Sequence, residues 1–224
     1  MQYGGYGLLI IGMIITLTAQ FLINKTYKKY SQVNSKNKLS GFEVARKILD
    51  ENGLKNIYVT ETAGVLTDHY DPTRKVVRLS QANFNGTTIS AIAVSAHEVG
   101  HAIQDKNNYI FLKIRSFIFP ITSFASKFGY FVITIGFIFG LTNVAWIGIG
   151  LLLFVLLFQL VTLPVEINAS KNALEYLKKY HILEPRELEQ GQKVLSAAAF
   201  TYVASLATTL LEILRLFIIN KDNN

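Results

Sequence analysis

His97, Glu98 and His101 have the types and spacing of a catalytic metal site. They stand in the pattern His-Glu-x-x-His, within a segment that has helical periodicity. Residues four apart lie on one face of a helix, so both imidazoles could reach the same ion. Glu98 would project beside that ion, where a carboxylate can take the proton of a water that attacks a peptide carbonyl. The pattern predicts His97 and His101 as metal ligands and Glu98 as general base.

The composition of the chain restricts which metal such a site would hold. The chain has no cysteine, which excludes thiolate ligands and disulfide bonds. Neutral imidazoles indicate zinc, one ion per chain, although cobalt, manganese or nickel would fit the same donors in vitro. The alternative is a surface helix whose two histidines and glutamate are merely solvated. Ala96, Gly100 and Ala102 favour the metal site, because small residues leave room beside an ion.

A catalytic zinc needs a third protein ligand and keeps one position open for water. Glu166 is the favoured ligand, since it is the first charged residue after a long apolar stretch and begins a helical pattern. Pro164 is expected to break the apolar span just before it. His69, His181 and other carboxylates stay open as alternatives, and a position at a helix N-terminus would explain Glu166 without metal. Ser170, one turn later, is a candidate to orient a ligand.

The segment Asp68–Asp71 contains a further candidate catalytic residue. It lies beside two β-prone runs, where an edge strand could pair with an extended substrate and His69 or Tyr70 could stabilise a developing oxyanion. The alternative is a turn whose aspartates bond their own backbone. His181 follows Tyr180 at the end of a helical pattern, where a favourable terminal charge is a better explanation than metal ligation.

Apolar stretches on both sides of these residues predict membrane-spanning helices. No charged residue occurs in 1–24 or in 128–165, and the second stretch is long enough for two crossings joined by a turn at Gly140–Asn143. A cleaved signal peptide is the alternative for the first stretch, which lacks a basic leader and a small-x-small cleavage site. The predicted order is transmembrane helix 1 at 1–24, an α+β region with the metal-binding helix at 25–115, a transmembrane hairpin at 116–164, a helix carrying the third ligand at 165–193 and transmembrane helix 4 at 194–220.

Local signals predict the elements of the α+β region. Ser40 and Glu43 have the spacing of a capping box at the start of a helix over 41–52. Thr87 or Thr88 is placed to cap the helix that carries the metal motif.

Two β-prone runs, 57–60 and 75–80, flank a turn signal at Asp71–Pro72. Together they predict a small antiparallel sheet.

Composition and charge restrict the class of protein and its orientation. Half of the residues are apolar, and 22 Lys+Arg against 15 Asp+Glu give a net charge of +7. Aromatic residues lie mainly inside apolar runs, which argues against a nucleic-acid partner. Basic residues gather after the first span and between the third and fourth spans: Lys25, Lys28, Lys29, Lys171, Lys178, Lys179, Arg186 and Lys193. Such segments are expected to face the cytoplasm.

Three charged residues fall inside or at the edge of predicted spans. Lys127 lies at the boundary of the second span, where its long stem could reach the interface or face other helices. Glu212 and Arg215, one turn apart, are expected to form an ion pair. These residues also suggest a transporter or channel subunit as a third class of function.

Four longer segments carry a family resemblance that extends over nearly the whole chain. They are Thr67–Pro72, Val77–Ser80, Ala91–Gln104 and Gln159–Glu166, and together they closely resemble the bacterial YugP-like neutral zinc metallopeptidases. The resemblance implies a multi-pass inner-membrane peptidase of the gluzincin kind, with His97, His101 and Glu166 as ligands and Glu98 as catalyst. Distant gluzincins often have an acid one turn after the third ligand, where this chain has Ser170.

The combined prediction is an α-helical multi-pass membrane protein with a small cytoplasmic α+β zincin-like portion. The expected function is a zinc-dependent endopeptidase that cleaves membrane proteins or peptides near the cytoplasmic face. Its partners would be a protein or peptide substrate and the lipid bilayer, with no nucleic acid. The alternative is a non-catalytic zinc-binding membrane adaptor or chaperone.

Overall fold

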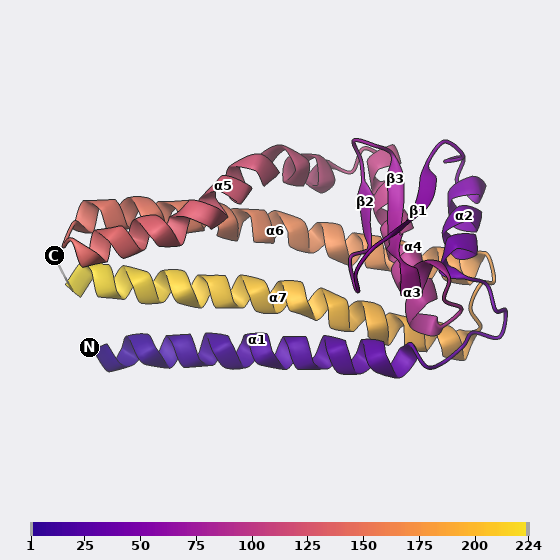
Figure 1. The fold of residues 1–224 in the computed structure, drawn as a ribbon, viewed down its shortest axis with the longest axis horizontal. Coiled ribbons are helices and arrows are strands. Elements are labelled where there is room, and N and C mark those ends of the chain that lie inside the picture. The colour runs from indigo at the N-terminus through magenta and orange to yellow at the C-terminus, as the bar shows by residue number, and fades with distance from the viewer. Residues whose placement is uncertain (1, 223–224) are drawn as a thin grey trace. The chain divides into compact units, whose positions relative to one another are not determined.

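The computed structural model describes residues 2–222 and is mostly helical, with one small sheet (Figure 1). Backbone contacts divide it into two units. The helical unit contains the residues up to 20, 111–164 and the residues from 200 onward, and the α+β unit contains 21–110 and 165–199. The elements are α1 (Gln2–Tyr30), α2 (Gly41–Glu51), β1 (Tyr58–Thr62), β2 (His69–Asp71), β3 (Val76–Ser80), α3 (Gln81–Phe84), α4 (Ile89–Lys106), α5 (Ile110–Ile138), α6 (Thr142–Lys179) and α7 (Pro185–Asp222).

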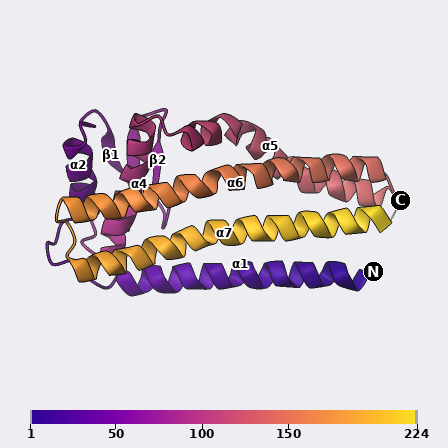
Figure 2. The ribbon, with the colours of Figure 1, turned by 180° about the vertical axis from the view of Figure 1, so that it is seen from behind.

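The helical unit is built from the apolar parts of α1, α5, α6 and α7, which run side by side (Figures 1 and 2). Among residues 2–222, these four helices are long and apolar enough to cross a membrane. The turn between α5 and α6 contains Gly140 at a φ of +65°, close to the predicted turn. A Cβ on Gly136 would lie 2.6 Å from the backbone nitrogen of Ala145, so glycine allows α5 and α6 to approach closely there.

The spanning helices extend beyond the boundaries that hydropathy predicts. Helix α1 continues to Tyr30, so the lysines expected just after it lie within its last turns. Helix α5 begins at Ile110, before the predicted start of the hairpin at 116, and α7 begins at Pro185, before the predicted start of transmembrane helix 4 at 194. Hydropathy marks where a helix is apolar, whereas a helix continues wherever its backbone hydrogen bonds do.

The prediction that Pro164 breaks the helical span before Glu166 is wrong. Helix α6 runs without interruption from Thr142 to Lys179, with Pro164 inside it. A proline costs a helix one backbone hydrogen bond, a loss that packed spanning helices can absorb. Glu166 therefore lies in the interior of a helix, and stabilisation at a helix N-terminus no longer explains its presence.

The sheet of the α+β unit has the strand order β1-β3-β2. Strands β1 and β3 pair in parallel, from Tyr58 opposite Val76 to Thr62 opposite Ser80. The predicted antiparallel pairing of these two runs is therefore wrong. The predicted turn exists, but it joins β3 to the short strand β2, which pairs with it antiparallel. The three-residue β2 was too short to be predicted. It adds a change of chain direction between β1 and β3, so these two strands run parallel.

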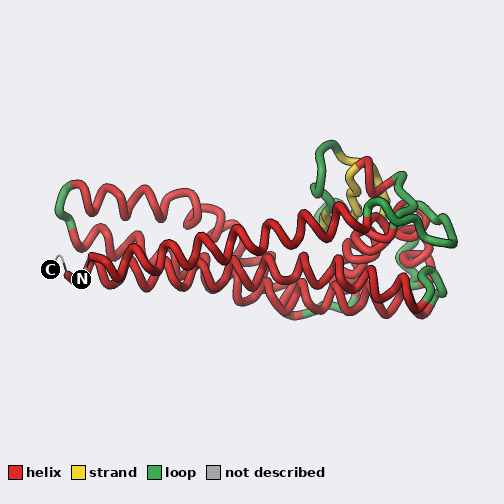
Figure 3. The backbone as a smooth tube through the Cα atoms, turned by 90° about the horizontal axis from the view of Figure 1, so that it is seen from below, coloured by secondary structure: helices red, strands yellow, loops and turns green. Residues whose placement is uncertain are grey.

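The core of the α+β unit lies between the sheet and its helices, and Figure 3 shows the strands confined to this part of the chain. Ser40 and Glu43 form the predicted capping box at the start of α2. Thr88 accepts a hydrogen bond from the backbone of Ala91 and caps α4. The fully buried members of the core include Val44, Ile48, Leu49, Val77, Leu79, Ile89, Ile92, Val99, Leu177 and Ile182. This core holds α4 in place.

Candidate metal site

Helices α4 and α6 bring two imidazoles and one carboxylate together within the α+β unit. His97 Nε2 lies 3.2 Å from Glu166 Oε2, and His101 Nε2 lies 3.6 Å from the same oxygen. One potential ligand atom from each of the three residues lies within 4.8 Å of the others. Glu166 and His101 are buried, at 2% and 7% exposure. The structure thus joins the two histidines of the motif to the carboxylate favoured as third ligand, 65 residues after His101 in the sequence.

Gly100 allows the two helices to approach at this point. A Cβ on Gly100 would lie 2.6 Å from the backbone carbonyl oxygen of Ala169, well inside normal contact distance. Ala169 itself is fully buried, and so is Ala173 one turn later. Small residues on both helices therefore set the distance at which His97 and His101 can meet Glu166.

The Gln104 side chain fixes the orientation of the His101 ring. Its amide nitrogen Nε2 donates to the carbonyl oxygen of Val165 at 2.8 Å and to Asn168 Oδ1 at 2.9 Å. A backbone carbonyl can only accept, so the amide oxygen must be the atom that faces His101 Nδ1 at 3.0 Å. His101 Nδ1 therefore carries the proton, and the lone pair of its neutral ring is on Nε2, the atom that faces Glu166.

This arrangement leaves two acceptors facing each other. In the neutral ring, His101 Nε2 and Glu166 Oε2 both present lone pairs, and the same oxygen also faces His97 Nε2. Ser170 Oγ lies 3.1 Å from His97 Nδ1 and can hold that ring in the same way. Converging lone pairs require a cation between them, either a proton or a metal ion.

The donor set fits zinc. Two imidazole nitrogens and one carboxylate oxygen are a known catalytic zinc set, and ligand atoms ~2.1 Å from a tetrahedral ion lie ~3.4 Å apart. The two separations to Glu166 Oε2, 3.2 and 3.6 Å, bracket that spacing, and the three ligand atoms all lie within 4.8 Å of one another. The imidazole Nδ1 atoms of both histidines are held by neighbouring side chains, as is usual for histidine ligands of metals.

Comparisons with known proteins show the family of this chain. Residues 6–221 match the family described as "Putative neutral zinc metallopeptidase". The chain belongs to this metallopeptidase family. It is also 43% identical over 222 residues to "Putative membrane protease YugP" of Bacillus subtilis (strain 168), a match that covers 97% of this chain and 98% of that protein. No solved structure matches the chain.

The relative's description as a membrane protease and the four apolar helices together indicate that this chain is a membrane protein. The family description also implies zinc. The sequence predicted both properties.

Glu98, which the sequence predicts as a general base, lies on α4 next to the converging ligands. Its side chain is buried, with 8% of the residue exposed. Burial raises the pKa of the Glu98 carboxyl, charge on His97 and His101 lowers it, and Glu166 raises it again, so that the pKa is above its ordinary value. A carboxyl group with a raised pKa is suited to accept a proton and hold it.

The pKa of His101 is also raised, although burial and the neighbouring carboxylate act on it in different directions. Burial lowers the pKa of the His101 imidazole, but the hydrogen bond and the charge of Glu166 raise it further, so the net shift is upward. The carboxylate therefore stabilises positive charge at the position where the three ligand atoms converge.

The other candidate residues lie outside this group. His69 is exposed on β2, and its Nδ1 lies 2.8 Å from the carbonyl oxygen of Thr67. His181 follows α6 in a left-handed backbone conformation with a φ of +50°. Among residues 2–222, the cluster of His, Asp and Glu able to hold a metal consists of His97, His101 and Glu166.

The sequence motif did not predict two residues of the site, Gln104 and Asn168. Gln104 is three residues after His101, a spacing that places both on the same helical face and could have identified it. Asn168 supports Gln104 from α6, and only the folded structure shows that contact. The turn interpretation of the Asp68–Asp71 segment is confirmed for Asp71 and wrong for Asp68, whose carboxylate accepts from the backbone and hydroxyl of Ser80 and from the side-chain amide of Asn83. Asp71 accepts from the backbone of Thr73 and Arg74.

Proposed function

We propose that this protein is a membrane-embedded zinc-dependent endopeptidase, with one zinc held by His97, His101 and Glu166. The observation that carries the proposal is the convergence of three lone-pair donors, with the His101 tautomer set by Gln104. Family membership supports the metal and the reaction class. A zinc ion bound there would polarise the scissile carbonyl and lower the pKa of a bound water.

Glu98 is the proposed general base and acid. Its carboxylate takes the proton of the attacking water and then donates it to the leaving amine nitrogen. His69 stays a proposal as a residue that stabilises the oxyanion, since it lies on β2, at the edge of the sheet.

The proposed substrates are membrane proteins or membrane-associated peptides, cleaved near the cytoplasmic face of the inner membrane. The distribution of lysine and arginine supports this orientation, because basic residues concentrate in the α+β unit and its adjoining helix ends. Nucleic acid is not among the proposed partners.

The substitution Glu98→Gln tests catalysis separately from metal binding. Cleavage of a library of fluorogenic peptides by the full chain in lipid vesicles should fall by about 10²- to 10⁴-fold, because the general base is lost. Zinc content should stay near that of the wild type, since Glu98 is not a ligand. Glu51→Gln, at an exposed glutamate of α2, is the matched control and should leave cleavage unchanged.

Undiminished cleavage by the Glu98→Gln variant would contradict the proposed mechanism. A wild-type protein that binds zinc and cleaves no peptide of the library, while an active relative does, would favour the adaptor or chaperone alternative.

A further inference from the structure

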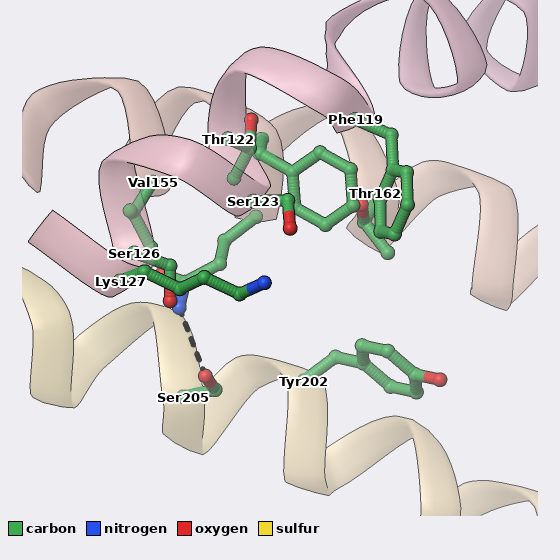
Figure 4. Close-up of a pocket in the computed structure, with 11 residues that line it drawn as sticks. Phe119, Thr122, Ser123, Ser126, Lys127, Val155, Thr162, Tyr202 and Ser205 are labelled. Atoms are coloured by element: carbon green, nitrogen blue, oxygen red, sulfur yellow. Dashed lines mark hydrogen bonds between the residues drawn. The ribbon is translucent and has the colours of Figure 1, made fainter. Parts of the chain in front are cut away.

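A cavity of about 410 Å³ lies within the helical unit, between α5, α6 and α7 (Figure 4). Its lining combines apolar rings such as Phe119 and Phe158 with hydroxyl groups, one amide and Lys127. None of these lining residues is a histidine, aspartate or glutamate, so the cavity offers no metal ligand of the kind found on α4 and α6. A more specific set of polar contacts lies in the α+β unit, around the short strand β2.

Strand β2 has little backbone support. It spans three residues, His69–Asp71, and lies at the edge of the sheet, where it pairs with β3. A strand of this length forms few backbone hydrogen bonds with one neighbour, so other contacts must help to hold its position. Two side chains supply such contacts: Asp68, directly before the strand, and Tyr70 within it.

The Asp68 carboxylate joins the start of β2 to the end of β3 and to α3. Its Oδ1 accepts from the backbone nitrogen of Ser80 at 2.7 Å, and its Oδ2 accepts from Ser80 Oγ at 3.1 Å and from Asn83 Nδ2 at 2.9 Å. Ser80 and Asn83 are 0% and 1% exposed, so these donors are shielded from water. Asn83 Oδ1 in turn accepts from the Tyr27 hydroxyl of α1 at 2.9 Å. A carboxylate can only accept, so the Asn83 amide nitrogen must be the atom that faces Asp68.

The Tyr70 side chain joins β2 directly to α4, the helix that carries His97 and His101. Its hydroxyl donates to Asp105 Oδ2 at 2.7 Å, and Asp105 lies one turn, about 6 Å along the helix axis, beyond His101. Burial and the hydrogen bond to Asp105 raise the pKa of the Tyr70 hydroxyl, so it stays protonated and donates. With that proton engaged, Tyr70 is not free to stabilise a developing oxyanion.

These contacts place β2 beside the proposed metal site. Asp68 and Tyr70 are two residues apart in an extended segment, so both side chains project from the same face, and the strand packs against α4. Burial is the main cause that raises the pKa of Glu98, and the charge of Asp68 is a lesser one, so β2 lies within electrostatic reach of the proposed general base. A peptide that reaches this base would pass close to β2.

We propose that Asp68 and Tyr70 are positioning residues, which hold β2 ready to bind an extended peptide substrate. This role rests on the proposed peptidase function, because it assigns β2 to the substrate of that reaction. Neither side chain is among the proposed metal ligands. Their effect is on preorganisation: if one contact is lost, β2 must be ordered when the peptide binds, and the affinity falls accordingly.

The substitution Tyr70→Phe removes one hydroxyl and keeps the ring that packs against the core. Asp105 keeps Lys75 as a partner, so its charge is not left unpaired. Measured on the full-length protein in detergent, hydrogen–deuterium exchange of the β2 amides should become faster, by on the order of tenfold for the loss of one hydrogen bond to a charged group. KM for the library peptide that the wild type cleaves best should rise by a similar factor, with kcat changed by less than about twofold and zinc content unchanged. Tyr58→Phe, in β1, is the matched control, because Tyr58 is 72% exposed and should affect neither exchange nor KM.

The contact between Asp68 and Asn83 can be tested by exchanging the two side chains. Asn83→Asp alone would set two carboxylates against each other, so it should speed exchange of the β2 amides and raise KM. Adding Asp68→Asn returns a donor opposite an acceptor, and the Tyr27 hydroxyl can still donate to position 83. Both quantities should then return toward wild-type values. Such recovery distinguishes a restored contact from general damage to the fold.

Unchanged β2 exchange in both Tyr70→Phe and Asn83→Asp would overturn the proposed role, whether or not the protein cleaves peptides. Faster exchange with a wild-type KM would also overturn it, because the strand would then be mobile without consequence for the substrate. So would a rise in KM that accompanies loss of zinc, since the contacts would then act on the metal. A wild type that holds zinc and cleaves no peptide would contradict the proposed function itself, and with it the assignment of β2 to a substrate.

Discussion

Both the nitrogen and the oxygen of the Gln104 side-chain amide form hydrogen bonds, and these bonds decide which nitrogen of His101 keeps its lone pair. Val165 and Asn168 accept from its nitrogen, so its oxygen is left for His101 Nδ1. Without Gln104 the ring could rotate or change tautomer, and its Nε2 lone pair would no longer be held toward Glu166. A residue that never touches the metal would thus control the affinity of the site.

The substitution Gln104→Ala should lower zinc affinity by about 10- to 100-fold, the range found when such supporting partners are removed. Competition with a chelator on the full-length protein in detergent measures this affinity. Gln81→Ala, at an exposed glutamine of α3, should leave it unchanged. Equal zinc affinity in the Gln104→Ala variant and the wild type would show that the contact does not support the ligand.

At the scale of elements, the crossing of α4 and α6 depends on Gly100. Alanine in a helix interior is normally more stable than glycine by up to about 1 kcal/mol. Here the added Cβ would meet the Ala169 carbonyl oxygen at 2.6 Å. Gly100→Ala should therefore destabilise the protein by roughly 1–3 kcal/mol, the usual cost of overpacking. It should also weaken zinc binding, because the ligands on the two helices would separate.

Gly191→Ala, in α7, is the matched control. Its Cβ would find ordinary contacts at 3.5 Å from Leu183 Cδ1 and 3.7 Å from Ala93 Cβ. Thermal unfolding in detergent should show this variant to be as stable as the wild type or more stable. A Gly100→Ala variant with the same stability and zinc affinity as Gly191→Ala would disprove the role of the close crossing.

The elements that sequence predicted correctly are those that local interactions decide. The capping box of Ser40 and Glu43 and the Thr88 cap lie within a few residues of the groups they satisfy. The parallel pairing of β1 and β3 depends on the intervening strand β2, which spans only three residues. Pairing between distant segments leaves no comparable local signal.

The site was predicted in part for the same reason. His97 and His101 share one helix, so their spacing alone puts them on one face. Glu166 was favoured only because it follows an apolar stretch, which is an indirect signal. The uninterrupted helix through Pro164 shows that Glu166 does not begin a new helix, as the sequence had suggested. Asn168 carried no signal at all, because its role exists only once α6 packs against α4.

At the scale of the whole molecule, the proposed orientation in the membrane can be tested with introduced cysteines, since the chain has none of its own. Lys55→Cys places a thiol at an exposed position of the α+β unit, and Leu141→Cys places one in the turn between α5 and α6. In intact bacterial cells, a membrane-impermeant maleimide should label the variant at position 141 and spare the variant at position 55. Both should react after permeabilisation. The reverse pattern of labelling would contradict a cytoplasmic active site.

The most direct test of the account is the zinc content of the purified, folded, full-length protein. We predict one zinc per chain in the wild type and in Glu98→Gln, and well below one in His97→Ala and Glu166→Ala after dialysis. Each variant must first show a thermal unfolding transition, so that loss of metal is not loss of fold. A folded wild type free of bound transition metal, or a Glu166→Ala variant that keeps its full zinc, would contradict a site built from these three ligands.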